Sequence, residues 1–232
     1  MLVDEWWRPA GAFEMLRWIA EARARLIPPA TRPGAVLVDI GCGAGLLAPH
    51  LRGKGYRHVG VDLVGSALRL AARHGVDPVR GDATRLPLAD RMADVVSAGE
   101  LLEHVPDLSA AVAEACRVLR PGGLLVLDTL NATLASRLIA VELGERLPVA
   151  PRGIHDPALF VRPQRLVAEC ARHGVRLAVR GLRPSVFSLI DWLVRAPLRR
   201  SAPEQALWKP RRRMVPTWST SVLYQGRGVK VG

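Results

Sequence analysis

A glycine-rich turn is the most chemically specific feature of the chain. Residues 38–45 read Val-Asp-Ile-Gly-Cys-Gly-Ala-Gly, after a short apolar run and before a predicted helix. Glycines at such a place let the backbone approach a ligand closely. Gly41, Gly43 and Gly45 follow the spacing G-x-G-x-G, and Leu46 stands where the dinucleotide fingerprint G-x-G-x-x-G has its third glycine. We therefore expect the three glycines to bind a cofactor, and their spacing speaks against a dinucleotide.

Two carboxylates indicate which cofactor this is. Asp39 lies two residues before Gly41, where its charge would repel a pyrophosphate but attract the ammonium group of a methionine moiety. Asp62 ends the next predicted strand, 21 residues beyond Gly41, and a carboxylate there can bridge two ribose hydroxyls. Both NAD and S-adenosylmethionine carry such a ribose, so Asp62 alone does not separate them. Together with the glycine spacing, the two carboxylates predict S-adenosylmethionine.

A third set of polar residues follows the predicted strand 93–98. Glu100, Glu103 and His104 have the spacing i, i+3, i+4, which predicts that they share one face of a helix. Open α/β sheets bind ligands at the carboxyl ends of their strands, so these side chains are candidate catalytic residues. His104 could act as a general base, or the set could serve only packing and helix capping.

The predicted elements place all of these residues on one sheet. A helix is expected over 11–27, and strands over 36–40, 58–62, 78–80, 93–98 and 124–128. Helices between the strands are expected up to residue 51 and over 66–74 and 108–119. Strands that alternate with helices predict an α/β protein with a mainly parallel sheet and helices on both faces.

The pattern changes after Thr129. We expect a helix over 131–147 with two apolar stripes, packed between two protein surfaces or against an apolar ligand or membrane. A helix over 163–173, a strand over 175–183, a poorly ordered basic segment over 195–216 and a last strand over 217–225 follow. The chain thus divides into a helical cap (1–34), a cofactor-binding core (35–130), a substrate-side part (131–190) and a basic insertion with the final strand (191–232).

The net charge of +12 is concentrated near the C-terminus. Residues 191–232 hold nine lysines and arginines but only two acidic residues. Such a segment suits nucleic acid or an anionic membrane, or forms an ordinary solvated surface. No nucleic-acid-binding motif accompanies it, so we do not expect a nucleic-acid partner. Arg199, Arg200 and Arg211–Arg213 are candidates for peripheral contact with anionic head groups.

Cysteine usage and hydropathy bear on location. The three cysteines lie far apart without metal-type spacing, which favours reduced thiols. The N-terminus does not read as a signal peptide, and no apolar run reaches the roughly 18 residues of a spanning helix. We expect a cytoplasmic protein that at most touches a membrane peripherally.

Four segments resemble the class I S-adenosylmethionine-dependent methyltransferases, which have a Rossmann-like fold: VDIGCGAG, GVDL, GDATRLPLAD and RVLRPGGLL. The resemblance implies that Asp82 lies near the exocyclic amine of the cofactor's adenine and that the Ala83 backbone lies near the ring. A solvent-facing turn is the alternative role for Asp82.

A narrower resemblance covers roughly residues 6–182 and points to the ubiquinone-biosynthesis O-methyltransferases. Its segments are WWRPAGAF, LRWIAEARARLI, GELLEHVPD, DTLNAT and PRGIHDPALFVRP. The resemblance implies that Arg23 approaches the cofactor carboxylate and that Gly99 forms part of the cofactor wall. It also implies a divalent cation, Mg²⁺, on Glu100, Glu103 and His104, although histidine is an unusual partner for that ion.

The function expected from these features is methyl transfer from S-adenosylmethionine to a small-molecule acceptor. O-methylation of a phenolic or catechol-like molecule, with a prenylated quinone precursor as one candidate, fits the resemblance. His155 is a second candidate base. The resemblance fades beyond Gly181, so the acceptor stays open. The alternatives are N- or C-methylation of another metabolite, an NAD-dependent oxidoreductase, and a cofactor-binding relative without catalysis.

Overall fold

The computed structural model describes residues 5–8, 13–143, 153–199 and 213–231. Its centre is one eight-stranded sheet with the order β3-β2-β1-β4-β5-β8-β6-β7. β1 to β5 run parallel, whereas β8 is antiparallel to both of its neighbours, β5 and β6. The strands are β1 (Val36–Ile40), β2 (Arg57–Asp62), β3 (Asp77–Arg80), β4 (Ala93–Gly99), β5 (Leu119–Leu130), β6 (Val175–Pro184), β7 (Met214–Thr217) and β8 (Leu223–Lys230).

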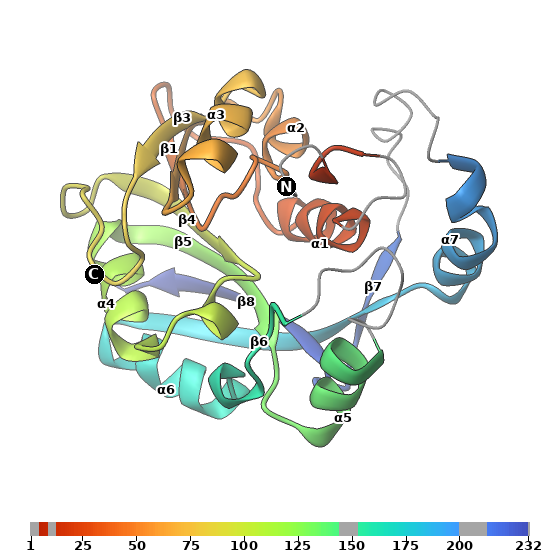
Figure 1. Cartoon of the computed structure of the whole chain (residues 1–232). Coiled ribbons are helices and arrows are strands. Elements are labelled where there is room, and N and C mark those ends of the chain that lie inside the picture. The colour runs from red at the N-terminus through yellow and green to blue at the C-terminus, as the bar shows by residue number, and fades with distance from the viewer. Residues whose placement is uncertain (1–4, 9–12, 144–152, 200–212, 232) are drawn as a thin grey trace.

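Helices cover both faces of this sheet. Figure 1 shows α1 and α2 on one side and α4 and α6 on the other. The α-helices are α1 (Glu14–Ala24), α2 (Ala48–Leu51), α3 (Gly65–Arg73), α4 (Leu108–Val118), α5 (Leu134–Ser136), α6 (Pro163–Arg172) and α7 (Val186–Arg199). Two short 3-10 helices, Leu102–His104 and Pro157–Leu159, lie in loops, and a π-helix over Arg137–Leu143 continues α5. The expected α/β fold is confirmed.

Successive residues of the central strands face two different cores. Leu37 packs with Ile27 of the segment after α1, whereas its neighbour Val38 packs with the α4 side of the sheet, and both are fully buried. A parallel sheet covered on both faces requires this continuous apolar pattern. The layers fix the direction of β1 and therefore the place of the glycine turn that follows it.

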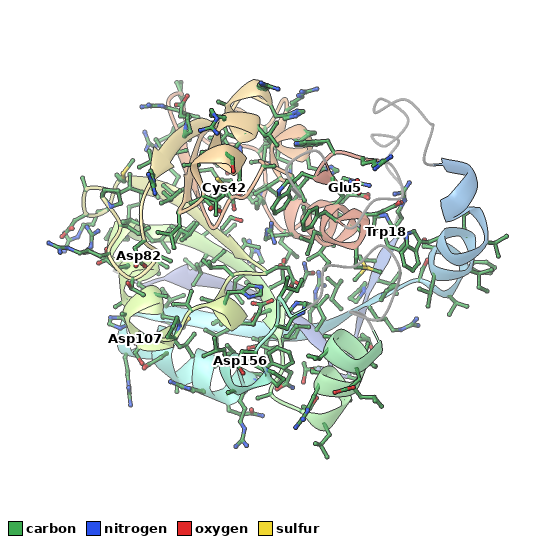
Figure 2. The ribbon with its side chains drawn as sticks, viewed as in Figure 1. Glu5, Trp18, Cys42, Asp82, Asp107 and Asp156 are labelled. Atoms are coloured by element: carbon green, nitrogen blue, oxygen red, sulfur yellow. The ribbon has the colours of Figure 1, made fainter. Side chains whose placement is uncertain are left out.

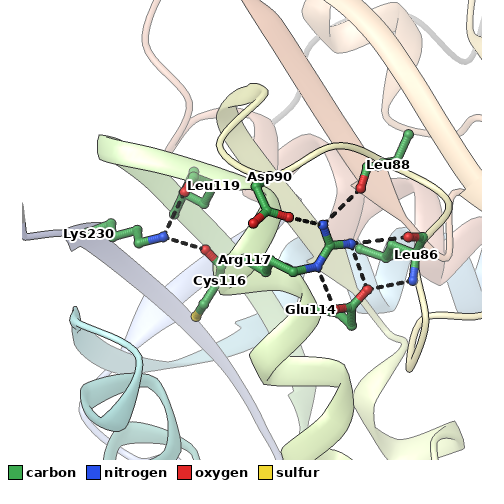
Figure 3. Close-up of polar contacts among 8 residues, drawn as sticks. All are labelled: Leu86, Leu88, Asp90, Glu114, Cys116, Arg117, Leu119 and Lys230. Carbon is green, nitrogen blue, oxygen red and sulfur yellow. Dashed lines mark hydrogen bonds and ion pairs between the residues drawn. The ribbon is translucent and has the colours of Figure 1, made fainter.

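One arginine fixes the loop between β3 and β4. Arg117 of α4 donates to the carbonyl oxygens of Leu86 and Leu88 and forms an ion pair with Glu114 (Figure 3). Lys230, at the end of β8, donates to two carbonyl oxygens, those of Cys116 and Leu119, at the end of α4. These bonds hold the segment after Asp82 and join the last strand to α4.

The C-terminal part differs most from expectation. The predicted last strand over 217–225 is wrong in its bounds, because a turn with hydrogen-bonded Ser219 and Ser221 separates β7 from β8. The predicted helix over 131–147 is a single α-turn followed by the π-helix, and residues 144–152 lie outside the described part. Of the predicted irregular segment over 195–216, the structure describes two ends, which belong to α7 and β7.

Candidate active site

One cavity of about 1510 Å³ opens at the carboxyl ends of β1, β2 and β4. Pockets for one small molecule usually measure about 300–1,000 Å³, so this cavity has room for two. Its wall has two parts of different chemistry. The glycine half is lined by Gly41, Gly43, Asp62, Asp82, Ala83 and Thr84, and the apolar half by Leu130, Leu182, Leu189, Trp192, Met214 and Leu223.

The glycine turn requires glycine for both conformation and space. Gly41 and Gly43 have φ values of +69° and +52°, in the left-handed region that favours glycine. A Cβ on Gly43 would lie 2.9 Å from the ring of Trp6. Figure 2 labels Cys42, the buried residue between them. Gly41 and Gly43 both line the cavity, with Trp6 packed against Gly43.

Asp62 stands beside this turn at the end of β2. Its Oδ2 accepts from the backbone N–H of Gly43 at 2.9 Å, and its Oδ1 accepts from that of Val64 at 2.8 Å. Each carboxylate oxygen can accept a second hydrogen bond. The half-buried carboxylate is thus fixed in orientation, and it can still accept hydrogen bonds from two neighbouring hydroxyl groups such as those of a ribose.

Asp82 lies on the cavity wall after β3, at the left of Figure 2. Its Oδ1 accepts from both the backbone N–H and the hydroxyl of Thr84, each at 2.8 Å. These hydrogen bonds lower the pKa of the Asp82 carboxyl, so it is ionised at neutral pH. Ala83 lines the same stretch of wall.

Asp39 was expected to attract the ammonium group of the cofactor, but its side chain lies away from the cavity wall. The residue is buried beneath the turn, and its Oδ2 lies 3.6 Å from Nε2 of His58. Burial alone would raise the pKa of Asp39, but His58 and Arg23 lower it below its usual value. Side chains alternate along β1, so Ile40 reaches the cavity and Asp39 does not. Asp39 is thus not among the residues that line the cavity, and its role at the ammonium of the cofactor stays a prediction.

The buried side chain of Arg23 packs against Gly99, which is half-buried, behind the wall. Nη1 of Arg23 donates to Oδ1 of Asp128 at 2.7 Å, and a Cβ on Gly99 would lie 1.3 Å from that nitrogen. Burial alone would lower the pKa of Arg23, but Asp128 raises it, so the guanidinium stays charged. Neither Arg23 nor Gly99 lines the cavity. Gly45 lies outside the wall as well, packed against Ala71 of α3.

The three residues after β4 do not share a helical face, so that prediction is wrong. The helix there is a 3-10 turn over Leu102–His104, and Glu100 precedes it with φ of +50°. Glu100 and His104 line the cavity, whereas Glu103 is fully buried and its Oε2 accepts from the hydroxyl of Thr129 at 2.6 Å. Glu103 and His104 are consecutive residues of this turn and point about 120° apart, while Glu100 lies before the turn in a left-handed conformation.

These positions do not fit the Mg²⁺ site. Across the described ranges, no three His, Cys, Asp or Glu side chains are grouped so that they could hold a metal ion. Burial raises the pKa of Glu103 to about 7 and, with Glu103 and Asp128 nearby, raises that of Glu100 well above its usual value. Glu103 in addition does not line the cavity, so the three side chains do not converge on one ion there.

Two imidazoles stand on the cavity wall instead. The rings of His104 and His155 lie with centroids 5.5 Å apart and planes 27° from parallel. Partial burial lowers the pKa of His104, and the nearby His155 lowers it further. His104 is therefore neutral at pH 7 and able to accept a proton.

Several site residues escaped the sequence analysis. Trp6 stacks on Phe13 with centroids 4.1 Å apart, and both line the cavity next to Gly43. The pair of tryptophans before an amphipathic helix was the available signal. Asp128, the partner of Arg23, could have been noticed as an acidic residue in the apolar run of β5.

Comparisons with known proteins agree with this fold. A methyltransferase domain family matches residues 38–127. The ubiquinone biosynthesis O-methyltransferase of Thiobacillus denitrificans is 36% identical over 75% of this chain and 79% of its own. The protein of the same name from Leptothrix cholodnii is 31% identical over 83% of this chain and 87% of its own.

Solved structures share the fold at low identity. A possible histamine N-methyltransferase from Thermotoga maritima is 18% identical, with a TM-score of 0.63 over 94% of this chain and 90% of its own. A phosphoethanolamine N-methyltransferase from Haemonchus contortus, in complex with S-adenosylmethionine, is 15% identical, with a TM-score of 0.62 over 93% of this chain and 53% of its own.

Fold and matches together define a class I methyltransferase that depends on S-adenosylmethionine. Within that class, the chain belongs to the family of the ubiquinone biosynthesis O-methyltransferases. Among the described helices, none is both long and apolar enough to cross a membrane.

Proposed function

We propose that this methyltransferase O-methylates a phenolic or catechol-like acceptor that carries an apolar substituent, such as a prenylated quinone precursor. The observation that carries the proposal is the continuity of the two halves in one cavity. The glycine half fits a nucleoside, and the apolar half fits a hydrocarbon chain. His104 lines the same wall, so the acceptor's hydroxyl can lie near a base. The names of the relatives agree with such an acceptor.

The cofactor contacts proposed here follow the polar groups of the glycine half. Asp62 would accept from the two ribose hydroxyls, and Asp82 from the exocyclic amine of adenine, with Ala83 against the ring. The backbone of Gly41 and Gly43 would lie along the methionine moiety. Arg23 packs against Gly99 at the end of β4. The carboxylate of the cofactor would therefore lie at the end of β4, on the side of Arg23. Gly45 contributes by letting α3 pack closely behind the turn.

His104 is the proposed general base. Bound S-adenosylmethionine supplies a methyl group on a sulfonium, which is already a strong electrophile. The imidazole takes the proton of the acceptor hydroxyl while that oxygen forms its bond to the methyl carbon and the carbon–sulfur bond breaks. The proton remains on His104, and the sulfur leaves as a neutral thioether. The protein contributes orientation and this proton transfer.

Incubation with labelled S-adenosylmethionine and a panel of catechols, phenols and amines tests the proposal. Methyl ethers are the expected products, and N- or C-methylated products would favour the alternative transferases. Calorimetry should give binding of S-adenosylmethionine but not of NAD. His104→Ala should lower kcat about a hundredfold or more with an unchanged cofactor affinity. Normal turnover in that variant would remove His104 as the base.

Peripheral contact with an anionic membrane is part of the proposal, because a prenylated acceptor resides in a bilayer. Large apolar side chains are exposed near the cavity: Leu134, Leu138, Val186, Phe187, Ile190 and Val194. Arg213, expected at the head groups, is instead buried against Glu14 and Trp18. Arg200, Arg211 and Arg212 lie outside the described residues, as does the side chain of Arg199.

Vesicle flotation tests this contact. Binding to vesicles that contain phosphatidylglycerol is expected to be stronger than binding to neutral vesicles and to weaken with salt. Phe187→Ser combined with Val194→Ser should weaken binding to both vesicle types. No binding to either vesicle type would contradict membrane contact and favour a water-soluble acceptor.

A further inference from the structure

A short strap, residues 5–8, packs on the glycine turn. Its Trp6 lines the cavity, and a Cβ on Gly43 would lie 2.9 Å from the outer edge of the Trp6 indole. The next residue, Trp7, is buried in a small cluster with Ala44 of the same turn. The strap therefore contacts the glycine turn through two consecutive aromatic side chains.

Arg17 of α1 holds the backbone of this strap. Its Nη1 donates to the carbonyl oxygen of Trp6 at 2.9 Å, and its Nη2 donates to that of Arg8 at 3.0 Å. The Arg17 side chain is buried, and a carboxylate oxygen of Glu14 lies 3.8 Å from its Nη2. Hydrogen bonds from a charged donor are stronger than neutral ones. Arg17 thus fixes the backbone on both sides of Trp7.

Ring stacking ties the strap at two further points. Trp7 stacks on His74, the residue that caps the C-terminus of α3, with centroids 3.7 Å apart. Trp6 stacks on Phe13, at the start of α1, with centroids 4.1 Å apart. These contacts leave the outer edge of the Trp6 ring turned toward Gly43.

Gly43 joins the strap to the proposed ribose site. Its backbone N–H donates to the carboxylate of Asp62 at 2.9 Å, while Trp6 packs against its Cα. All three residues line the cavity. A ligand that is held by Asp62 and follows the glycine turn would therefore contact the Trp6 indole.

We propose that Trp6 is a wall residue of the S-adenosylmethionine site and that Arg17 is the positioning residue that keeps it there. This inference rests on the proposed cofactor contacts at the glycine turn. Arg17 does not line the cavity and acts only through the carbonyl groups of the strap. A contact made in the bound complex mainly slows dissociation, so both residues should slow the release of the cofactor.

The test is the dissociation rate of labelled S-adenosylmethionine in a chase with unlabelled cofactor. Trp6→Ala removes the wall, and Arg17→Met removes the donors but keeps an unbranched side chain, so each should raise the rate about tenfold. Arg17→Lys can still donate to a carbonyl oxygen and should restore part of the wild-type rate. Arg52→Met, at the exposed end of α2, is the matched control and should behave as the wild type.

The double variant distinguishes positioning from a general structural role. If Arg17 acts through Trp6, adding Arg17→Met to Trp6→Ala should change the dissociation rate less than about twofold. Two full and independent effects in the double variant would overturn the positioning role. Trp6 is half-buried, so Trp6→Ala tests the wall by itself, and a wild-type rate in that variant would remove Trp6 from the site.

Asp62→Ala separates this inference from the cofactor placement on which it rests. Faster dissociation in Asp62→Ala, with wild-type rates in Trp6→Ala and Arg17→Met, would overturn the inference and leave the placement standing. Wild-type rates in all three variants would overturn both.

Discussion

The glycine half of the cavity takes its polar groups from residues 41–84, at the ends of three neighbouring parallel strands. The apolar half gathers side chains from β5, β6, α7, β7 and β8, which are spread over residues 130–223. Hydrogen bonds with distances of 2.8–2.9 Å fix the polar groups of the first half. The side chains named for the second half are all apolar and contact the cavity through packing.

We therefore expect the glycine half, the proposed cofactor site, to be the rigid part and the apolar half, the proposed acceptor site, to be the adaptable part. Backbone hydrogen bonds demand one geometry, whereas apolar contacts tolerate changes of shape when volume is kept. Substitutions in the glycine half should therefore change stability or cofactor affinity, and substitutions in the apolar half should change the KM of the acceptor.

The largest effect is expected behind the glycine half. Gly99→Ala would place a Cβ on the Arg23 guanidinium and separate it from Asp128, leaving a buried carboxylate without its partner. The free energy of unfolding should fall by about 3 kcal/mol, measured by urea denaturation. Gly65→Ala is the control, because its Cβ would meet nothing nearer than 3.8 Å. Equal stability of both variants would show that the ion pair does not support the glycine half.

An effect of similar size is expected in the way the free energy of unfolding depends on pH. Burial raises the pKa of Glu103 to about 7 from an ordinary value of 4.5, so the folded state prefers the protonated form. The stabilisation is complete below pH 4.5 and is lost as pH rises through about 7, with a change of at most about 3 kcal/mol.

Glu103→Gln keeps a neutral side chain and should flatten this dependence in urea titrations between pH 5 and 8. Glu21→Gln, at an ion pair with Arg25, should leave the slope between pH 5 and 8 as in the wild type. A wild type whose stability rises over this range would contradict the assignment.

A smaller effect is expected within the glycine half itself. Asp62→Ala removes the acceptor for the ribose hydroxyls and should weaken S-adenosylmethionine binding about tenfold to a hundredfold by calorimetry. Asp77→Ala, an exposed carboxylate paired with Arg57, should bind normally. Unchanged affinity in the Asp62 variant would overturn the role of β2 in cofactor binding.

The smallest effect belongs to the apolar half. Leu189→Ala removes part of an apolar wall and should raise KM for an alkylcatechol about fivefold, without a change in cofactor affinity. Phe187→Ala is matched to it, because Phe187 lies on the same helix, is 88% exposed and does not line the cavity. A parallel loss of cofactor affinity in the Leu189 variant would mean that the two halves are coupled.

The alternation of strands and helices and the glycine turn could be predicted because both are local. The period of apolar residues defines β1, and the positive φ of Gly41 and Gly43 is a property of that turn. The arrangement of Glu100, Glu103 and His104 could not be predicted in the same way. The choice between a 3-10 turn and an α-helix depends on which residues pack against that segment. Here the hydroxyl of Thr129 in β5 donates to the carboxylate of Glu103, which is buried.

The sequence alone was enough to predict the alternation of strands and helices, the glycine turn and the positions of Asp62 and Asp82 near the strand ends. Each depends on residues close together in the chain. Only the tertiary structure decided that Arg23 pairs with Asp128, that Asp39 lies beneath the turn and that His104 meets His155. These contacts join segments separated by many residues, and their free energy comes from burial, which exists only once the layers have packed.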